Sequence, residues 1–307
     1  MDILTSVDTA KEHIMKIRQV KGLDVLNNNA SDLEAALIMW IWSSGYTSLY
    51  FFLLTLFSLS EQLYQKSTHF LLELIQNVDD NTYRESQPTL NLTFKKRTLR
   101  VDCNEVGFSK ENVEAICRIG RSTKAGLNHT SRYIGEKGIR FKSVFKVSDI
   151  VWINSGHYSF KFDKQERLGM IAPIWAEFPE LTSPGFTSIL LDISEDYNTK
   201  ALLHKLKKLD SKLLIFLQKL RHVDVMIFGD SGVLWKRTLL REDDNTKSNG
   251  QQQVITLDND GHQVLYVITR FRVENMPPEP KREGYTHLEI ILTFPIFDLN
   301  RAKIDLQ

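Results

Sequence analysis

The chain has 307 residues, enough for two ordinary domains, and its 42% hydrophobic and 25% charged residues are typical of a packed globular protein and exclude a largely disordered one. The 39 Lys and Arg residues nearly balance the 38 Asp and Glu residues, so the net charge of +1 argues against non-specific nucleic-acid binding, which needs a basic surplus. Two cysteines, Cys103 and Cys117, exclude a disulfide scaffold and a four-cysteine zinc site, and we expect an intracellular location, cytoplasmic or nuclear.

Residues 1–37 are predicted to form N-terminal helices. The first helix is expected over Asp8–Leu26, and a second is expected to begin near Ser31, where Ser31 and Glu34 have the spacing of a capping box. The N-terminus does not resemble a secretory signal, because no basic start leads into an apolar core.

Residues 38–59 form an apolar segment that interrupts this helical region. No residue from Ala35 to Ser60 is charged. As a helix, that stretch would be about 39 Å long at about 1.5 Å per residue. Since the hydrocarbon core of a bilayer is about 30 Å thick, hydropathy alone leaves a membrane span open.

Residues 60–196 are predicted to mix helices and strands without a strict βαβ alternation, which favours an α+β fold. Helices are expected over Glu61–Asp80, Asn112–Ile119 and Phe141–Val147. Strands are expected over Thr89–Phe94, Thr98–Val101, Ile150–Asn154, Tyr158–Phe162 and Ser188–Ile193.

A helix and a β-rich second domain are expected over residues 197–307, with the boundary near Asp196. The Leu and Lys pattern predicts a long helix over Thr199–His222, and Asp243–Gln253 reads as a polar loop. The chain ends soon after a strand pattern, so we expect this second domain to be truncated. Its predicted strands are Val223–Phe228, Val233–Arg241, Val254–Leu257, Val264–Glu274 and Leu288–Phe294.

The predicted helix over Phe70–Asp80 carries the first candidate site. At about 100° per residue, its apolar side chains occupy one side, and Glu73, Asn77 and Asp80 fall within about 60° on the other. An amide oxygen such as that of Asn77 suits Mg²⁺, and a carboxylate one turn away can polarise water. The same pattern also fits an ordinary amphipathic helix with a solvated face.

Four further segments strengthen the ligand-binding interpretation. Val101–Phe108 ends a strand with an acid and a turn, and Ile134–Ile139 contains two glycines at a predicted helix start, where free N–H groups attract phosphate. Between them, Gly120–Arg132 is a polar stretch of the kind that closes over a ligand, and Gly185–Thr187 precedes a strand. Each signal is weak alone, and their order and spacing make them strong together.

This set resembles the Bergerat (GHKL) nucleotide-binding fold shared by the large heat-shock chaperone, gyrase, histidine kinases and the MutL repair proteins. More narrowly, it resembles the histidine kinase-like ATPase branch of sacsin and NO VEIN, found in large plant and fungal proteins. The resemblance covers roughly Ser60 to Phe228, and it is carried by Phe70–Asp80, Asn104–Phe108, Ala115–Lys124 and Ile134–Phe145.

The resemblance implies a two-layer α/β sandwich that binds ATP with Mg²⁺. In that family pattern Glu73 matches the general base of ATP hydrolysis, and Asn77 matches the Mg²⁺ ligand. Asp80 is expected among the nucleotide contacts.

The resemblance also implies an adenine side to the site. Asp102 matches the adenine-reading acid, and Asn104 is a rival because the following turn is one residue longer than in the broad family. Gly107 is expected beneath the adenine, and Thr187 matches the threonine that supports the adenine-side hydrogen bonds.

Residues of the lid and of the phosphate loop complete the implied site. Lys124 lies in the expected lid, which runs from Gly120 to Tyr133. Gly135, Lys137 and Gly138 are expected near the phosphates.

Two departures from the family pattern bear on activity. The third glycine of the phosphate loop is Arg140 here, and its side chain would block the phosphates, point outward or contact a phosphate directly. The second departure is the apolar segment of residues 38–59. We weigh a non-native insertion such as a translated intron, a hydrophobic insertion and a true membrane span, and we do not expect membrane association.

The sequence therefore predicts an ATPase module of chaperone-like type, with a lid that closes over nucleotide. The alternatives are a degenerate, non-catalytic module that acts as a protein-interaction domain and a membrane-tethered protein. Five positions after Gly135 stands Arg140 rather than Lys, so a P-loop is excluded. No phospho-accepting histidine helix is evident, and protein-kinase activity is not expected. The sequence does not indicate which protein partners or clients bind.

Overall fold

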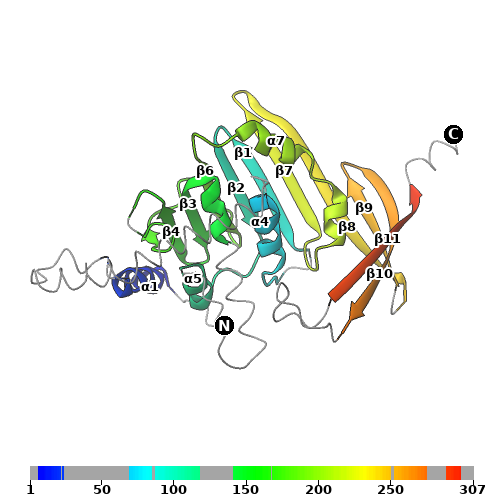
Figure 1. The fold of residues 1–307 in the computed structure, drawn as a ribbon, viewed down its shortest axis with the longest axis horizontal. Helices are drawn as coiled ribbons and strands as arrows, with labels where there is room; N and C mark the ends of the chain where they lie inside the picture. The colour runs from blue at the N-terminus through cyan, green and yellow to red at the C-terminus, as the bar shows by residue number, and fades with distance from the viewer. Residues whose placement is uncertain are drawn as a thin grey trace, which may run out of the picture.

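The computed structural model describes residues 6–21, 23, 69–84, 87–117, 141–166, 168–249, 252–274 and 288–298. These residues form an α+β fold around a mixed sheet of 11 strands, in the order β11-β10-β9-β8-β7-β1-β2-β6-β3-β4-β5 (Figure 1). Strands β1 and β7 pair in parallel, and every other neighbouring pair is antiparallel.

The described α-helices are α1 (Val7–Val20), α4 (His69–Asp79), α5 (Lys110–Cys117) and α7 (Thr199–Lys207), with 3₁₀ helices η3 (Lys142–Lys146) and η4 (Ser211–Ile215). The strands are β1 (Thr89–Lys95), β2 (Thr98–Cys103), β3 (Ser148–Ser155), β4 (Tyr158–Asp163), β5 (Ile174–Trp175), β6 (Thr187–Ile193), β7 (His222–Gly229), β8 (Gly232–Asn249), β9 (Gln252–Asn259), β10 (His262–Val273) and β11 (Leu288–Asp298).

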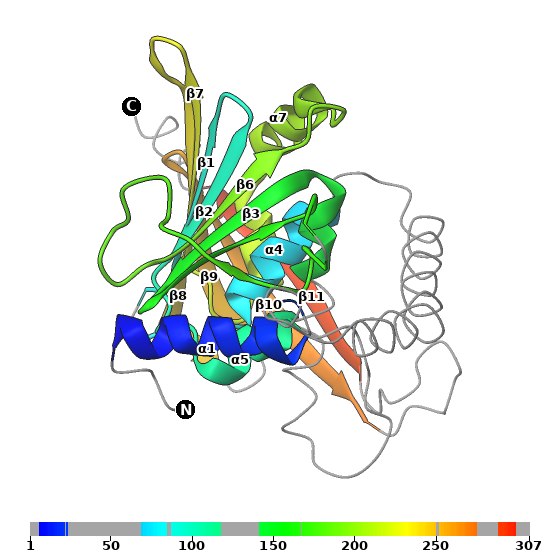
Figure 2. The same ribbon diagram turned by 90° about the vertical axis from the view of Figure 1, so that its left-hand side faces the viewer.

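One face of the sheet is continuously apolar and carries the helices. The strand register places Leu92 beside Val101 on one side and Val225 on the other, and Val101 beside Ile189. Because side chains alternate between the faces of a strand, these residues all point to the same face. They belong to a core cluster that also includes buried residues of α1, α4, α5 and α7 (Figures 1 and 2).

Helix α1 begins at a defined cap and covers the β4–β5 end of the sheet. The Ser6 side chain accepts from the N–H of Thr9, and Ala10 and Ile14 are fully buried. His13 Nδ1 lies 2.7 Å from the Tyr158 hydroxyl. The helix ends at Val20, six residues before the predicted end at Leu26, and residues 24–26 lie outside the described part of the chain.

The predicted long helix over Thr199–His222 is wrong. Helix α7 ends at Lys207, η4 follows over Ser211–Ile215, and His222 already belongs to β7. The break has a local cause, because the Asp210 side chain accepts from the N–H of Lys212 and starts a new turn. The leucines remain buried on both sides of the break, so the apolar pattern does not reveal it.

Two other predicted elements differ from the structure. The first part of the expected loop Asp243–Gln253 is strand, because β8 continues to Asn249 and pairs there with Gln252 of β9. This pairing depends on main-chain hydrogen bonds, which a polar sequence does not prevent. The expected helix Phe141–Val147 is the short 3₁₀ helix η3.

The sheet runs without interruption past the expected domain boundary at Asp196. Residues Thr89–Lys95 of β1 pair with His222–Phe228 of β7, so strands from both sides of that position share one sheet. Within the described residues, no helix is long and apolar enough to span a bilayer. The predicted helix near Ser31 and the apolar segment 38–59 lie outside the described residues.

Candidate functional site

A cavity of about 640 Å³, its open mouth included, lies between α4, α5 and the ends of β2 and β6. Most of the wall is apolar, and the polar groups come from amide, thiol and hydroxyl side chains. The described lining residues are Leu74, Asn77, Val78, Asn81, Val101, Cys103, Phe108, Asn112, Ala115, Ile116, Phe141, Thr187 and Ile189.

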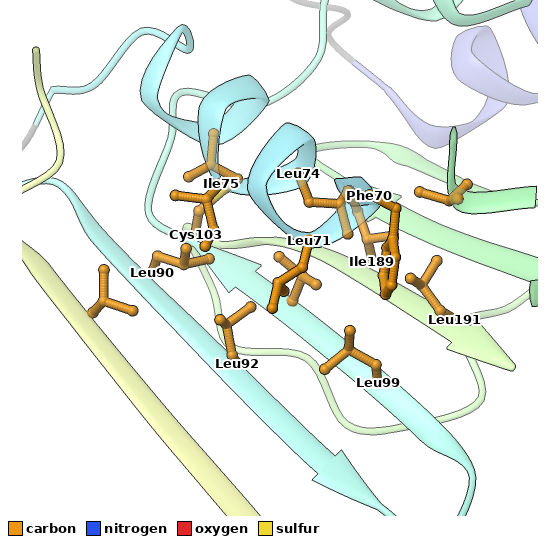
Figure 3. Close-up of a cluster of buried hydrophobic side chains, with 14 of the residues drawn as sticks. Phe70, Leu71, Leu74, Ile75, Leu90, Leu92, Leu99, Cys103, Ile189 and Leu191 are labelled. Carbon is orange, nitrogen blue, oxygen red and sulfur yellow. The ribbon is translucent and has the colours of Figure 1, made fainter. Parts of the chain in front are cut away.

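Helix α4 is fixed to the sheet by its apolar side. Phe70, Leu71, Leu74 and Ile75 are at most 2% exposed and pack against β1, β2 and β6, as Figure 3 shows. The predicted division of this helix into an apolar and a polar side is therefore present in the structure. Because the apolar side is held by the core, the polar side projects in a fixed direction.

The polar side of α4 carries two buried oxygen atoms without hydrogen bonds to the described residues. These are Glu73 Oε2 and Asn77 Oδ1, in side chains that are otherwise half-buried. Asn77 also lines the cavity. Residues four apart on a helix have Cβ atoms about 5–6 Å apart, so the two groups are neighbours. A buried polar atom without a partner costs about 1–3 kcal/mol. Other such atoms occur, as in Ser194 and Thr293, and this pair differs from them by its position on one helix beside the cavity.

Two aspartates at the end of α4 differ in what they contact. Asp79 is 5% exposed, and its carboxylate accepts from the N–H groups of Gln218, Lys219 and Leu220, each at 2.8 Å. It therefore ties α4 to the segment that leads into β7. The predicted nucleotide contact Asp80 follows the helix and is not among the residues that line the cavity.

At the end of β2, the residue that faces the cavity is Cys103, between the two predicted adenine-side residues. Asp102 points to the opposite face of the sheet, where it accepts from Arg100 Nε at 2.9 Å and from Ser188 Oγ at 2.5 Å. Asn104 Oδ1 accepts from the N–H of Thr89 at 2.7 Å. Neither Asp102 nor Asn104 lines the cavity.

The turn after β2 brings the backbone close to β3. Gly107 has a φ of +92°, which favours glycine, and its neighbour Phe108 lines the cavity. The N–H of Phe108 donates to Ser155 Oγ at 2.8 Å. The same hydroxyl lies 2.6 Å from the hydroxyl of Thr187, which the sequence predicted as an adenine-side residue and which lines the cavity.

Helix α5 begins with a reciprocal pair of hydrogen bonds between Ser109 and Asn112. The N–H of Ser109 donates to Asn112 Oδ1 at 2.9 Å, and the N–H of Asn112 donates to Ser109 Oγ at 3.4 Å. This arrangement caps the helix and fixes the Asn112 side chain at the cavity wall.

Two lysines bind the carbonyl end of α5. Lys142 Nζ donates to the carbonyls of Ile116 and Met170, both at 2.5 Å, and Lys21 Nζ donates to the carbonyl of Cys117 at 3.0 Å. Positive charge is favourable at this end of a helix. Burial nevertheless lowers the pKa of Lys142 to about 7.

The predicted lid and phosphate-loop residues Lys124, Gly135, Lys137 and Gly138 lie outside the described residues, as does Arg140. Of the other predicted site residues, the structure brings Asn77 and Thr187 to one cavity, with Glu73 one turn from Asn77.

Cavity residues that the motif analysis missed are Asn81, Cys103 and Asn112. Cys103 had a signal, since it continues the alternation of Leu99 and Val101 with polar residues, but the predicted strand ended at Val101. The other two had none, because their positions depend on how α4 and α5 pack on the sheet.

No family model matches the chain. A stretch of 117 residues is 50% identical to Protein NO VEIN of Arabidopsis thaliana. That stretch is 38% of this chain and 4% of the relative, so the chain spans only a small part of that much longer protein. The similarity supports the predicted likeness to the NO VEIN branch over this part of the chain.

Proposed function

We propose that the chain is a module that binds ATP with Mg²⁺ and hydrolyses it slowly. The observation that carries the proposal is the pair of buried oxygens on α4, Glu73 Oε2 and Asn77 Oδ1, which have no hydrogen-bond partner among the described residues. A polar group that is buried at a cost in stability is explained when a ligand completes its interactions. The resemblance of this helix to the Bergerat family implies the same ligand, and the similarity to Protein NO VEIN supports the likeness to the NO VEIN branch.

The side chains suit the proposed roles. Asn77 Oδ1 is an oxygen donor of the kind that Mg²⁺ prefers, and it lies at the cavity. The described residues contain no group of three His, Cys, Asp or Glu side chains that could hold a metal alone. A single amide ligand fits a cation that is held mainly by the phosphates of its nucleotide. In this proposal Glu73 orients a water molecule and accepts its proton.

The cavity suits the base of the nucleotide. Apolar side chains such as Leu74, Phe108 and Ile189 form its walls, and Thr187 supplies a hydroxyl at its edge. Closure of the lid predicted from Gly120 to Tyr133 would separate the bound nucleotide from water, as lids do in other enzymes.

The first test is calorimetric titration of the chain with MgATP, followed by measurement of phosphate release. We expect Glu73→Ala to keep nucleotide binding and to lower the rate of hydrolysis by at least a hundredfold, and Asn77→Ala to weaken binding only when Mg²⁺ is present. The matched control is Gln76→Ala, an exposed position on the same helix, which should change neither quantity. Unchanged hydrolysis by Glu73→Ala would rule out the role of this carboxylate.

A second candidate is a non-catalytic module that uses the same fold for protein interaction. Two observations favour it: no carboxylate lines the described part of the cavity, and Arg140 replaces a glycine of the family pattern. Titration of an Arg140→Gly variant beside the natural chain separates the two. Binding of MgATP by the variant alone would favour the interaction module, and saturable binding by the natural chain would favour the ATPase.

A further inference from the structure

The polar side chains that line the cavity share a property that determines which bases they can bind. Each of them is neutral, and each can both donate and accept a hydrogen bond. Within the described lining they are the amides of Asn77, Asn81 and Asn112, the thiol of Cys103 and the hydroxyl of Thr187.

The thiol of Cys103 occupies the place where the motif analysis expected an acid. Burial raises its pKa well above the usual value, so the side chain is a neutral thiol at physiological pH. It is 3% exposed and lies directly opposite Thr187 in the pairing of β2 with β6. Cys103 and Thr187 therefore present a thiol and a hydroxyl side by side to the cavity.

The hydrogen bond between the two hydroxyl groups beside Cys103 can reverse its direction. Ser155 and Thr187 are joined by a hydrogen bond of 2.6 Å in which either oxygen can be the donor. Ser155 Oγ also accepts from the N–H of Phe108, so rotation of the two hydroxyl hydrogens lets Thr187 present either a donor or an acceptor to the cavity.

Two carboxylates lie near Cys103, those of Glu105 and Asp102, and neither lines the cavity. Asp102 lies on the opposite face of the sheet and is held by Arg100 and Ser188. Arg100 is itself fixed by Glu180 at 2.9 Å, so this network has its own partners. An ionised carboxylate only accepts hydrogen bonds, and such a group would prefer the amino group of adenine to the carbonyl oxygen of guanine.

We infer that the cavity binds adenine and guanine nucleotides with similar affinity, and that Cys103 is the residue that removes the preference for adenine. This inference rests on the proposed nucleotide-binding function and deepens it. Adenine presents an amino donor where guanine presents an oxygen acceptor. Reversible groups such as Cys103 and Thr187 satisfy either pattern, whereas a site of fixed polarity leaves buried groups unpaired with the wrong base.

The test is the ratio of the dissociation constants for MgATP and MgGTP, measured by calorimetry on the full chain. MgCTP, whose base is smaller, serves as a comparison. We expect the natural chain to bind ATP and GTP within about fivefold of each other and CTP more weakly, because a pyrimidine leaves part of the cavity unfilled. Cys103→Asp, measured at a pH at which its carboxyl group is ionised, should favour ATP over GTP by at least tenfold, because an ionised carboxylate only accepts.

Two variants control this experiment. Cys103→Ser keeps a reversible donor and acceptor and should keep the natural ratio. Asp102→Asn should also keep it, because Asp102 faces away from the cavity. Thermal unfolding of each variant shows whether it is folded, and Cys103→Asn replaces Cys103→Ser if the smaller side chain prevents folding.

The outcomes separate this inference from the function on which it rests. A preference of the natural chain for ATP of a hundredfold or more, or a loss of ATP preference in Asp102→Asn, would overturn the inference and leave nucleotide binding intact. Absence of binding for all three nucleotides by the folded natural chain would overturn both. Similar affinity for ATP and GTP, with an adenine preference gained in Cys103→Asp, would establish it.

Discussion

Helix α4 carries buried polar groups of two kinds, some with hydrogen-bond partners and some without. At its end, the Asp79 carboxylate accepts three main-chain hydrogen bonds of 2.8 Å from residues 218–220. Six and two residues earlier, Glu73 and Asn77 each leave a buried oxygen without a partner in the described part of the chain. The same helix thus joins a region that is held by satisfied hydrogen bonds to a region whose buried oxygens have no partner among the described residues. On this helix, the satisfied carboxylate holds the fold, and the unsatisfied pair marks the candidate site.

The largest expected effect on stability comes from Asp79, whose carboxylate has its hydrogen-bond partners. Asp79→Ala leaves one buried and two partly buried N–H groups without their acceptor, so we expect the free energy of unfolding to fall by about 3 kcal/mol. Urea unfolding followed by circular dichroism measures the change. The control Gln76→Ala, exposed on the same helix, should change stability by less than about 0.5 kcal/mol. An equal loss of unfolding free energy in both variants would show that the hydrogen bonds of Asp79 add nothing to stability.

A smaller effect on stability is expected from Lys142, a buried charged group that has hydrogen-bond partners but is destabilised by its burial. Its ammonium group bonds two carbonyls, yet burial lowers its pKa to about 7. In the unfolded chain a lysine titrates near 10.4, so the unfolded state binds more protons above pH 7. The free energy of unfolding should therefore rise with pH, by up to roughly 1 kcal/mol per unit from this group.

The measurement is the slope of the unfolding free energy between pH 7 and 8, in the natural chain and in Lys142→Met. Cys103 and Cys117 are present in both chains, so the titration of their unfolded thiols, near pH 8.5, cancels in the comparison of the two slopes. Lys21 also has a lowered pKa because of burial, and Lys21→Met serves as the matched control at the same helix end. Equal slopes in the natural chain and Lys142→Met would show that Lys142 remains charged through this range.

The sequence predicted the strands of the sheet better than the elements between them. Alternation of apolar residues marks β1, β2 and β4, because one face of each strand is buried against helices. The predicted helix over Thr199–His222 failed because a leucine repeat does not distinguish one helix from two short ones separated at Asp210. The strand character of residues 243–249 could not be predicted, since it depends on pairing with β9.

The candidate site was predictable where its residues lie on one regular element. Glu73 and Asn77 follow from the helical period alone. Reading the motif after β2 favoured the acid at Asp102, whereas the alternation of Leu99 and Val101 favours Cys103, and it is Cys103 that faces the cavity. Motif chemistry and strand geometry gave different answers there, and the geometry decided which side chain faces the cavity.

The smallest effect on stability is expected from Asn77, whose buried oxygen has no partner among the described residues. This substitution also tests most directly the difference between Asn77 and Asp79. Asn77 Oδ1 has no hydrogen bond to lose among the described residues, so Asn77→Ala should not lower the free energy of unfolding by more than about 0.5 kcal/mol. The same variant should weaken Mg²⁺-dependent ATP binding by at least tenfold. A stability loss close to that of Asp79→Ala would mean that other protein groups bond Asn77, and this oxygen would then no longer mark a ligand site. A stable variant that has lost binding would assign Asn77 to the ligand rather than to the fold.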